Sequence, residues 1–350
     1  MAASPIAIWA GLFTLYFVWG STYIGIRVSV ETIQPFLMAA IRFRIAGVLI
    51  LAWEIFATRR LRSDPTVPEA DRPHLPTRRE WRDSAIVGGA LLGGGMGMVA
   101  LGETTVPAGI AAIFIAMLPV WVAILGRVFF GERLPAAVIV GIVVGLVGVV
   151  VLVAPIGSTG TLAFDPRGIF VLLLSPMFWG IGSVYASHRA TLPRRPLTAA
   201  GLQMICGGGI LLLAAILVGE LRTFDIAAVS ARSWLALLYL IAIGSLIGFT
   251  TFVWLLRVAP LPKIATYAYV NPVVAFVLAA ILLGETIEPR SVVAGAVIIF
   301  AVALIVTARG RAAAEAPEPL EAGLPTERPP TDGPHTEDGV GGAARVIYPD

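Results

Sequence analysis

Lys263, Tyr267 and Asn271 are spaced four residues apart in an apolar stretch, which places an ammonium, a phenol and an amide on one stripe of a helix. Polar groups are costly inside a membrane and commonly face a ligand, an ion or one another there. The stripe therefore predicts part of a substrate-binding cavity, formed by Tyr267 and Asn271. Lys263 has an alternative interpretation, in which its ammonium reaches lipid phosphate. Asn271 has another, in which its amide repairs the backbone hydrogen bonding that Pro272 disturbs.

A Trp-Gly pair occurs twice, at Trp19 and at Trp179, and a tyrosine follows each pair, Tyr23 and Tyr185. Ser21 comes directly after the first pair. Both tryptophans lie deep in their apolar stretches, which fits poorly with the belt of aromatic residues at a membrane interface. We therefore expect these five side chains to line a cavity and to contact a small molecule.

Arg42 lies about 9 Å from the nearer end of its apolar stretch, which is too deep for a guanidinium that faces lipid. Two partners suit it equally well: the carboxylate of Glu103, or a carboxylate carried by a substrate. Gln203 stands at the corresponding place in the second half of the chain and is a further candidate for substrate contact.

Several kinds of chemistry are excluded by what the apolar stretches lack. All histidines and aspartates are expected in loops or in the tail, so no buried metal cluster or aspartyl pair is available. Cys206 is the single cysteine, which excludes a disulfide within the chain. Lys263 is the single lysine and stands outside any phosphate-binding loop motif, so the chain is not an ATPase. We expect no metal ion and no cofactor.

The composition indicates that a bilayer surrounds these residues. Apolar residues make up 57% of the chain and charged residues 13%, against about 45–50% and about 25% in soluble domains. A bilayer core of about 30 Å requires about 20 apolar residues in a helix. The sequence thus predicts an all-α membrane protein with ten transmembrane helices, near residues 6–26, 36–56, 84–102, 107–129, 136–154, 167–186, 197–218, 233–255, 260–283 and 290–308.

The positions of the basic residues predict the orientation. The first apolar stretch is interpreted as a retained helix, because no basic residue precedes it as in a signal peptide. With the N-terminus inside, fifteen lysines and arginines fall in inner segments and five in outer loops. The positive-inside rule therefore predicts that both termini lie in the cytoplasm.

The sequence contains an internal repeat. Pro119 and the pair Gly131-Glu132 recur as Pro272 and Gly284-Glu285 at a constant offset of 153 residues, and Pro107 recurs as Pro260. Because each half holds five predicted helices, an odd number, the second half enters the membrane in the opposite sense. The sequence thus predicts two inverted five-helix repeats, at residues 6–155 and 165–308.

Two segments lie outside the repeats. Residues 57–83 form an arginine-rich inner loop, which we interpret as a determinant of topology beside anionic lipid rather than a nucleic-acid site. Residues 309–350 form an acidic, proline-rich tail, whose composition is typical of disorder in the cytoplasm.

The motifs Trp19-Gly20-Ser21, Arg42-Phe43, Pro-Ala-Gly-Ile-Ala-Ala at 107–112 and the two Gly-Glu pairs resemble those of EamA-type permeases of the drug/metabolite transporter (DMT) superfamily. The chain is similar to a subgroup of bacterial inner-membrane transporters over residues 6–308. The resemblance implies a central cavity, alternating access and export of amino acids, other metabolites or drugs. The length of the inner loop and the tail departs from the family.

The expected function is therefore secondary transport of a small molecule across a bacterial-type inner membrane. If protons drive it, Glu103 is a better carrier than Glu54, which lies beside arginines near the inner surface. A membrane-embedded enzyme and a passive channel or scaffold are the alternatives. An enzyme would need converging acid, base or metal groups, which the apolar stretches do not offer. The sequence contains no feature that indicates the oligomeric state.

Overall fold

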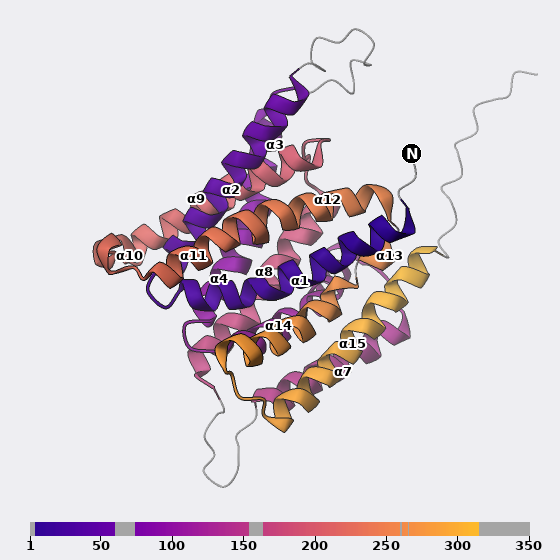
Figure 1. Ribbon diagram of the computed structural model, residues 1–350. Helices are drawn as coiled ribbons and strands as arrows, with labels where there is room; N and C mark the ends of the chain where they lie inside the picture. The colour runs from indigo at the N-terminus through magenta and orange to yellow at the C-terminus, as the bar shows by residue number, and fades with distance from the viewer. Residues whose placement is uncertain (1–3, 60–73, 154–163, 260, 265, 315–350) are drawn as a thin grey trace, which may run out of the picture. The chain divides into compact units, whose positions relative to one another are not determined.

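The computed structural model describes residues 4–59, 74–153, 164–259, 261–264 and 266–314, which fold as helices and their connections (Figure 1). The all-α prediction is confirmed. Eight helical segments are long and apolar enough to cross a membrane, and two further apolar helices, Ala136–Leu152 and Tyr267–Leu283, are shorter. The elements are, in order, α1 (Pro5–Ser29), α2 (Pro35–Thr58), α3 (Arg78–Gly88), η2 (Gly89–Met96), α4 (Gly97–Gly102), α5 (Ala108–Ile115), α6 (Leu118–Phe130), α7 (Ala136–Val153), α8 (Pro166–His188), α9 (Pro196–Leu217), α10 (Glu220–Thr223), η4 (Ile226–Ala228), α11 (Ala231–Tyr239), η5 (Leu240–Ile247), α12 (Gly248–Val258), α13 (Leu261–Ile264), α14 (Tyr267–Leu283) and α15 (Pro289–Ala314).

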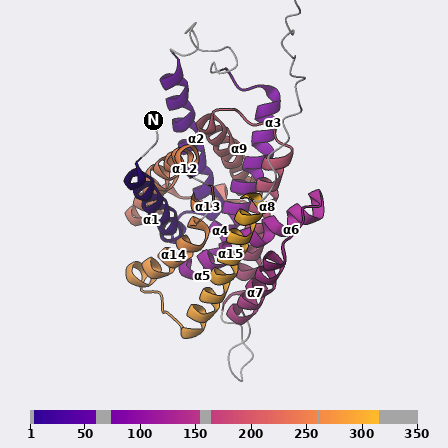
Figure 2. The same ribbon diagram turned by 90° about the vertical axis from the view of Figure 1, so that its right-hand side faces the viewer.

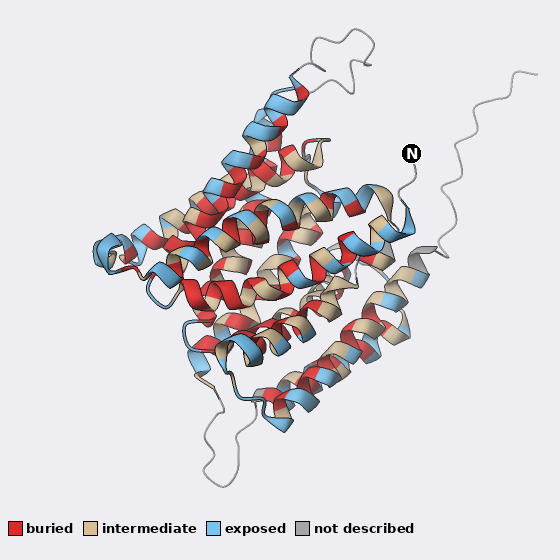
Figure 3. Ribbon diagram, viewed as in Figure 1, coloured by how far each residue is buried: buried red, intermediate tan, exposed pale blue. Residues whose placement is uncertain are grey.

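Helices from the two halves of the chain pack in pairs. α2 lies along α9 and α7 along α15, while α1 packs against α14 and α6 against α8 (Figures 1 and 2). Most of the long helices carry both exposed and buried residues along their length (Figure 3). The exposed residues are often large and apolar, such as Val140, Val143 and Val147 of α7. Such apolar outer faces suit contact with lipid tails.

Two candidate spans change helix type midway. α3, η2 and α4 form one span from Arg78 to Gly102, and α11, η5 and α12 form another from Ala231 to Val258. The middle segment of each, η2 and η5, is a π-helix of eight residues. π-helical turns are rare and occur frequently at functional sites. The two π-helices occupy the third and eighth helical segments, which correspond if the chain is a five-helix repeat.

The start of α3 differs from the sequence-based prediction. A capping box forms there, in which Thr77 Oγ1 accepts a hydrogen bond from Glu80 N at 3.2 Å and Thr77 N donates to Glu80 Oε2 at 2.7 Å. The helix therefore begins at Arg78 and includes Asp83, which is fully buried and accepts hydrogen bonds from Tyr185 Oη and Thr191 N. The expectation that every aspartate lies outside the apolar helices is wrong for Asp83.

Close backbone contacts join α3 to α9. A Cβ added at Gly88 would lie 2.2 Å from the carbonyl oxygen of Gln203, and one added at Gly207 would lie 2.5 Å from that of Gly88. No side chain larger than hydrogen fits between the two backbones at these crossings. Small residues at helix crossings are the usual basis of tight packing in membranes.

Three glycines adopt the left-handed conformation, each at a helix end and each followed by a glutamate. They are Gly131, Gly219 and Gly284, with φ of 67°, 84° and 68°. Glu220 accepts hydrogen bonds from Phe36 N at 3.2 Å and Leu37 N at 2.8 Å, in the first turn of α2. Burial raises the pKa of the Glu220 carboxyl, although these N–H groups oppose the shift. Each glycine thus ends the helix that precedes it. The glutamate that follows Gly219 binds the N-terminal turn of another helix.

The remaining expectations concern the chain's boundaries. α15 continues to Ala314, so residues 309–314 of the predicted tail are helical. Residues 315–350 of that tail, residues 60–73 of the inner loop, and Pro260 of the repeated proline pair lie outside the described residues.

Candidate functional site

A cavity opens where helices from both halves meet. Its volume, including the part open at its mouth, is about 810 Å³, which suits a small metabolite. It is lined by Trp19, Thr22 and Tyr23 of α1, Arg42 and Phe43 of α2, Leu92 and Met96 of η2, Ile115 of α5, Ala116 between α5 and α6, Leu118 and Pro119 of α6, Trp179 of α8, Phe249 of α12, and Tyr267, Ala268, Asn271 and Pro272 of α14. The structure therefore brings together six of the predicted site residues: Trp19, Tyr23, Arg42, Trp179, Tyr267 and Asn271.

One wall of the cavity is aromatic. The Trp19 ring lies 5.2 Å from the Tyr267 ring in an edge-on arrangement and 5.7 Å from the Phe249 ring. Phe252 packs behind, 5.2 Å from Trp19. Gly248 permits this arrangement, because a Cβ there would lie 2.5 Å from Trp19 Nε1. Rings packed edge to face hold one another in fixed orientations, so this wall is preorganised for contact with an apolar or aromatic ligand.

Arg42 brings the one formal charge among the residues that line the cavity. Its side chain is 4% exposed, its Nε donates a hydrogen bond to Ser245 Oγ at 3.1 Å, and its guanidinium lies 4.8 Å from the centre of the Phe43 ring. Ser245 belongs to the π-helix η5. The π-helix of one half thus holds the cation of the other half at the cavity.

Glu103 does not pair with Arg42. Both carboxylate oxygens of Glu103 are buried and accept no hydrogen bond within the described part of the chain. Arg27 Nη1 binds its backbone carbonyl instead, and the side chain is 0% exposed. Glu103 was one of the two partners expected for Arg42, and the structure shows no hydrogen bond between the two side chains. The other expected partner is a carboxylate carried by a substrate.

Asn271 presents an acceptor without a donor. Its side chain is 8% exposed, and its Oδ1 has no hydrogen-bond partner among the described residues. The amide precedes Pro272 inside α14. Since buried polar groups are nearly always paired, an orphaned acceptor on a cavity wall indicates a place for a ligand donor.

Three of the predicted substrate-binding residues lie away from this cavity. Ser21 shares a hydrogen bond of 2.5 Å with Tyr239, and Tyr185 donates one of 3.2 Å to Asp83. Gln203 lies on α9, where its backbone meets Gly88. Their predicted contact with substrate has no support from this cavity. Lys263 lies over the Trp9 ring, 4.2 Å from its centre, and does not line the cavity.

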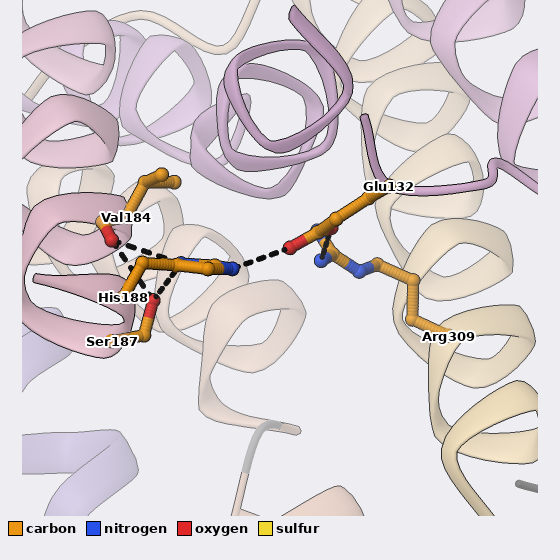
Figure 4. A network of polar contacts seen from close by, with 5 residues as sticks. All are labelled: Glu132, Val184, Ser187, His188 and Arg309. Carbon is orange, nitrogen blue, oxygen red and sulfur yellow. Dashed lines mark hydrogen bonds and ion pairs between the residues drawn. The ribbon is translucent and has the colours of Figure 1, made fainter. Parts of the chain in front are cut away.

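Glu132 joins an ion-pair cluster at the far end of α6. Its Oε2 lies 2.7 Å from Arg309 Nη2 of α15 and its Oε1 lies 3.3 Å from His188 Nε2 of α8, as Figure 4 shows. The His188 ring stacks on Phe130 with 4.0 Å between centres. The Glu132–Arg309 ion pair and the contact between Glu132 and His188 thus join the two halves at this end of the bundle. Within the described residues, no three His, Cys, Asp or Glu side chains gather to hold a metal ion.

A bundle of apolar helices from two chain halves around a largely apolar cavity with a few polar groups is typical of a membrane transporter. The chain belongs to the EamA-like transporter family, whose model matches residues 6–154 and 166–307.

Curated relatives carry transporter names. The chain is 37% identical to the uncharacterized inner membrane transporter YedA of Escherichia coli over 86% of its length and 90% of the relative's. It is 30% identical to a probable terminal-alkyne amino-acid exporter of Streptantibioticus cattleyicolor over 85% and 93% of the two chains. A solved crystal structure with 20% identity and a TM-score of 0.56, covering 89% of this chain and 99% of that one, shares the fold.

Proposed function

We propose that the protein is a secondary transporter that exports a small metabolite, such as an amino acid or a related compound, by alternating access between two inverted five-helix repeats. The observation that carries this proposal is the cavity, since α1, α2, η2, α5 and α6 of the first half and α8, α12 and α14 of the second contribute to its walls. Movement of one half against the other would then expose the same site to either side of the membrane.

The packing of the helices supports the inverted repeat. The helices of each half are numbered here from one to five. The first helix of one half packs on the fourth of the other in both directions, as α1 on α14 and α8 on α6. The second helices, α2 and α9, pack together, and so do the fifth, α7 and α15. If the helices of one half are exchanged with the corresponding helices of the other, the set of packed pairs stays the same, as expected for two repeats related by a twofold axis.

We further propose that both termini lie in the cytoplasm of a bacterium. Lys263 contacts Trp9, which places the start of α13 beside the start of α1. Glu132 binds Arg309, which places the end of α6 beside the end of α15. α14 follows α13 away from this side and α15 returns to it, so α15 ends on the side where α1 begins. With both termini on that side, most of the lysines and arginines of the sequence fall there too, as the positive-inside rule favours for the cytoplasm.

Trp19→Ala should lower saturable flux by about tenfold, because it removes the centre of the aromatic wall, and such contacts contribute about 1.4 kcal/mol. The measurement uses proteoliposomes loaded with a defined mixture of amino acids and small carboxylates, with efflux followed by mass spectrometry. Trp53→Ala is the matched control, since Trp53 is 64% exposed on α2. Flux that does not saturate would indicate a passive channel, and no protein-dependent flux of any compound would contradict transport.

Glu103 is the proposed proton carrier. It is buried, and neither of its carboxylate oxygens accepts a hydrogen bond from the described residues, while the charges of Arg27, Arg42 and Glu285 act on it. We expect an imposed proton gradient to accelerate wild-type flux several-fold and to leave flux through Glu103→Gln unchanged, because the amide cannot release a proton. Glu31→Gln is the control, since its carboxylate is partly exposed beside Arg232. A gradient response in Glu103→Gln, or none in the wild type, would rule out this role.

A further inference from the structure

The charges around the cavity are unbalanced. Arg42 lines it, and no aspartate or glutamate is among the residues that do. The hydrogen bond from Arg42 Nε goes to a neutral hydroxyl, that of Ser245. The charge of Glu103 acts on Arg42 from outside the cavity, without a hydrogen bond between them. A buried guanidinium without a bonded anion costs several kcal/mol, so an anionic group that enters the cavity is stabilised there.

The second polar feature of the cavity has the opposite requirement. Asn271 Oδ1 is a buried acceptor with no partner in the part of the chain that the structure describes, and only a donor can satisfy it. An ammonium, a hydroxyl or an amide N–H of a ligand supplies one. Arg42 on α2 and Asn271 on α14 belong to different halves of the chain, so a ligand that binds both connects the halves.

Most of the remaining lining is apolar, and Thr22, Tyr23 and Tyr267 contribute hydroxyl groups. Trp19, Tyr267 and Phe249 form the aromatic wall, and Leu92, Met96 and Ile115 are further apolar contributors. A ligand body that fills this space must therefore be apolar or aromatic. A strongly hydrated body, such as that of a sugar, would lose hydrogen bonds to water without replacement.

We propose that the cavity selects ligands that carry a carboxylate on an apolar or aromatic body, with the carboxylate at Arg42 and a donor group at Asn271, and that it rejects amines without an anionic group. The inference rests on the proposed function for the place where substrate binds. It narrows the substrate to zwitterions and organic anions, and it excludes cationic drugs. A measurement of ligand binding tests this inference without a transport assay.

Three probes with the same phenyl body separate the contributions: L-phenylalanine, 3-phenylpropionate and 2-phenylethylamine. Isothermal titration of the purified full-length protein in detergent micelles measures each Kd. We expect the two carboxylates to bind, and the amine to bind at least tenfold more weakly. Arg42→Gln should weaken the carboxylates by tenfold or more, since charge-assisted hydrogen bonds are lost. Asn271→Ala should weaken L-phenylalanine but leave 3-phenylpropionate unchanged, because only the former has an ammonium.

Arg44→Gln is the matched control. Arg44 carries the same charge on the same helix, is exposed and is absent from the cavity lining, so its loss should leave all three affinities unchanged. Equal binding of the amine and the carboxylates would overturn the inference, and this comparison needs only wild-type protein if a variant does not fold. Equal effects of Arg42→Gln and Arg44→Gln would overturn it too. If none of the probes binds, the ligand class is wrong, whereas saturable efflux of another compound would still uphold the proposed transport.

Discussion

Gly88→Ala should lower the free energy of unfolding by about 3 kcal/mol, the upper part of the usual range for overpacked cores. The added methyl would stand 2.2 Å from the carbonyl oxygen of Gln203 and 2.9 Å from its Cα. These are backbone atoms, so rotation of a side chain does not relieve the clash. α3 and α9 must then move apart. Because they belong to the third and seventh spans, the packing between these two spans is lost as well.

The control is Gly209→Ala, on the same helix as Gln203. Its Cβ would meet Arg44 Nη1 at 3.6 Å, an ordinary contact with a flexible side chain. Alanine favours the helix over glycine by about 1 kcal/mol, so this variant should be as stable as the wild type or more stable. Thermal unfolding of both variants in detergent micelles is the measurement. Equal melting temperatures for Gly88→Ala and Gly209→Ala would show that the two backbones do not approach as closely as described.

The cavity residues that the sequence predicted share one property. Trp19, Arg42 and Asn271 are large or polar groups deep in apolar stretches, where such side chains need a reason to be. Phe249 and Met96 line the same cavity but were not predicted, because an apolar residue in an apolar helix gives no sign of which way it faces. The π-helices η2 and η5 were also not predicted, since no local propensity distinguishes them from α-helix.

Helix geometry explains why Ser21 and Tyr185 lie elsewhere. At about 100° per residue, Tyr23 stays near the face of Trp19, four residues earlier, whereas Ser21 is turned about 200° away. Tyr185 follows Trp179 by six residues, which turns it about 240° from the cavity face. Tyr185 thus follows its tryptophan at a distance two residues greater than Tyr23 does, and this difference places it on another face of its helix.

The repeated Gly-Glu pairs differ in their partners. Glu285 binds backbone N–H groups of α5, whereas Glu132 binds the side chains of Arg309 and His188. A third pair, Gly219-Glu220, caps α2 in the manner of Glu285. It lies outside the twofold sequence pattern, which is why it was not predicted. At one end of the bundle, carboxylates of one half thus bind helix N-termini of the other. At the other end, Glu132 pairs with Arg309 and Glu54 with Arg195.

Glu285→Ala should cost about 3 kcal/mol of stability. The carboxylate accepts hydrogen bonds from Ala108 N at 2.7 Å and Gly109 N at 3.1 Å. Each is charge-assisted, with a net worth of about 1.5–3 kcal/mol, and the N-terminal end of α5 attracts the negative charge in addition. Alanine leaves both N–H groups without a partner at a point where Pro107 already fixes the start of the helix.

Glu285→Gln should be intermediate in stability, because its amide oxygen accepts one hydrogen bond but carries no charge. Glu288→Ala, three residues further on and exposed, should leave the stability unchanged. Thermal unfolding of the three variants in detergent micelles ranks them, and the order Glu288→Ala, Glu285→Gln, Glu285→Ala from most to least stable is the expected result. If Glu285→Ala and Glu288→Ala have the same melting temperature, the stability of the α5 N-terminus does not depend on the Glu285 carboxylate. The two hydrogen bonds from α5 to Glu285 would then contribute nothing to holding the halves together.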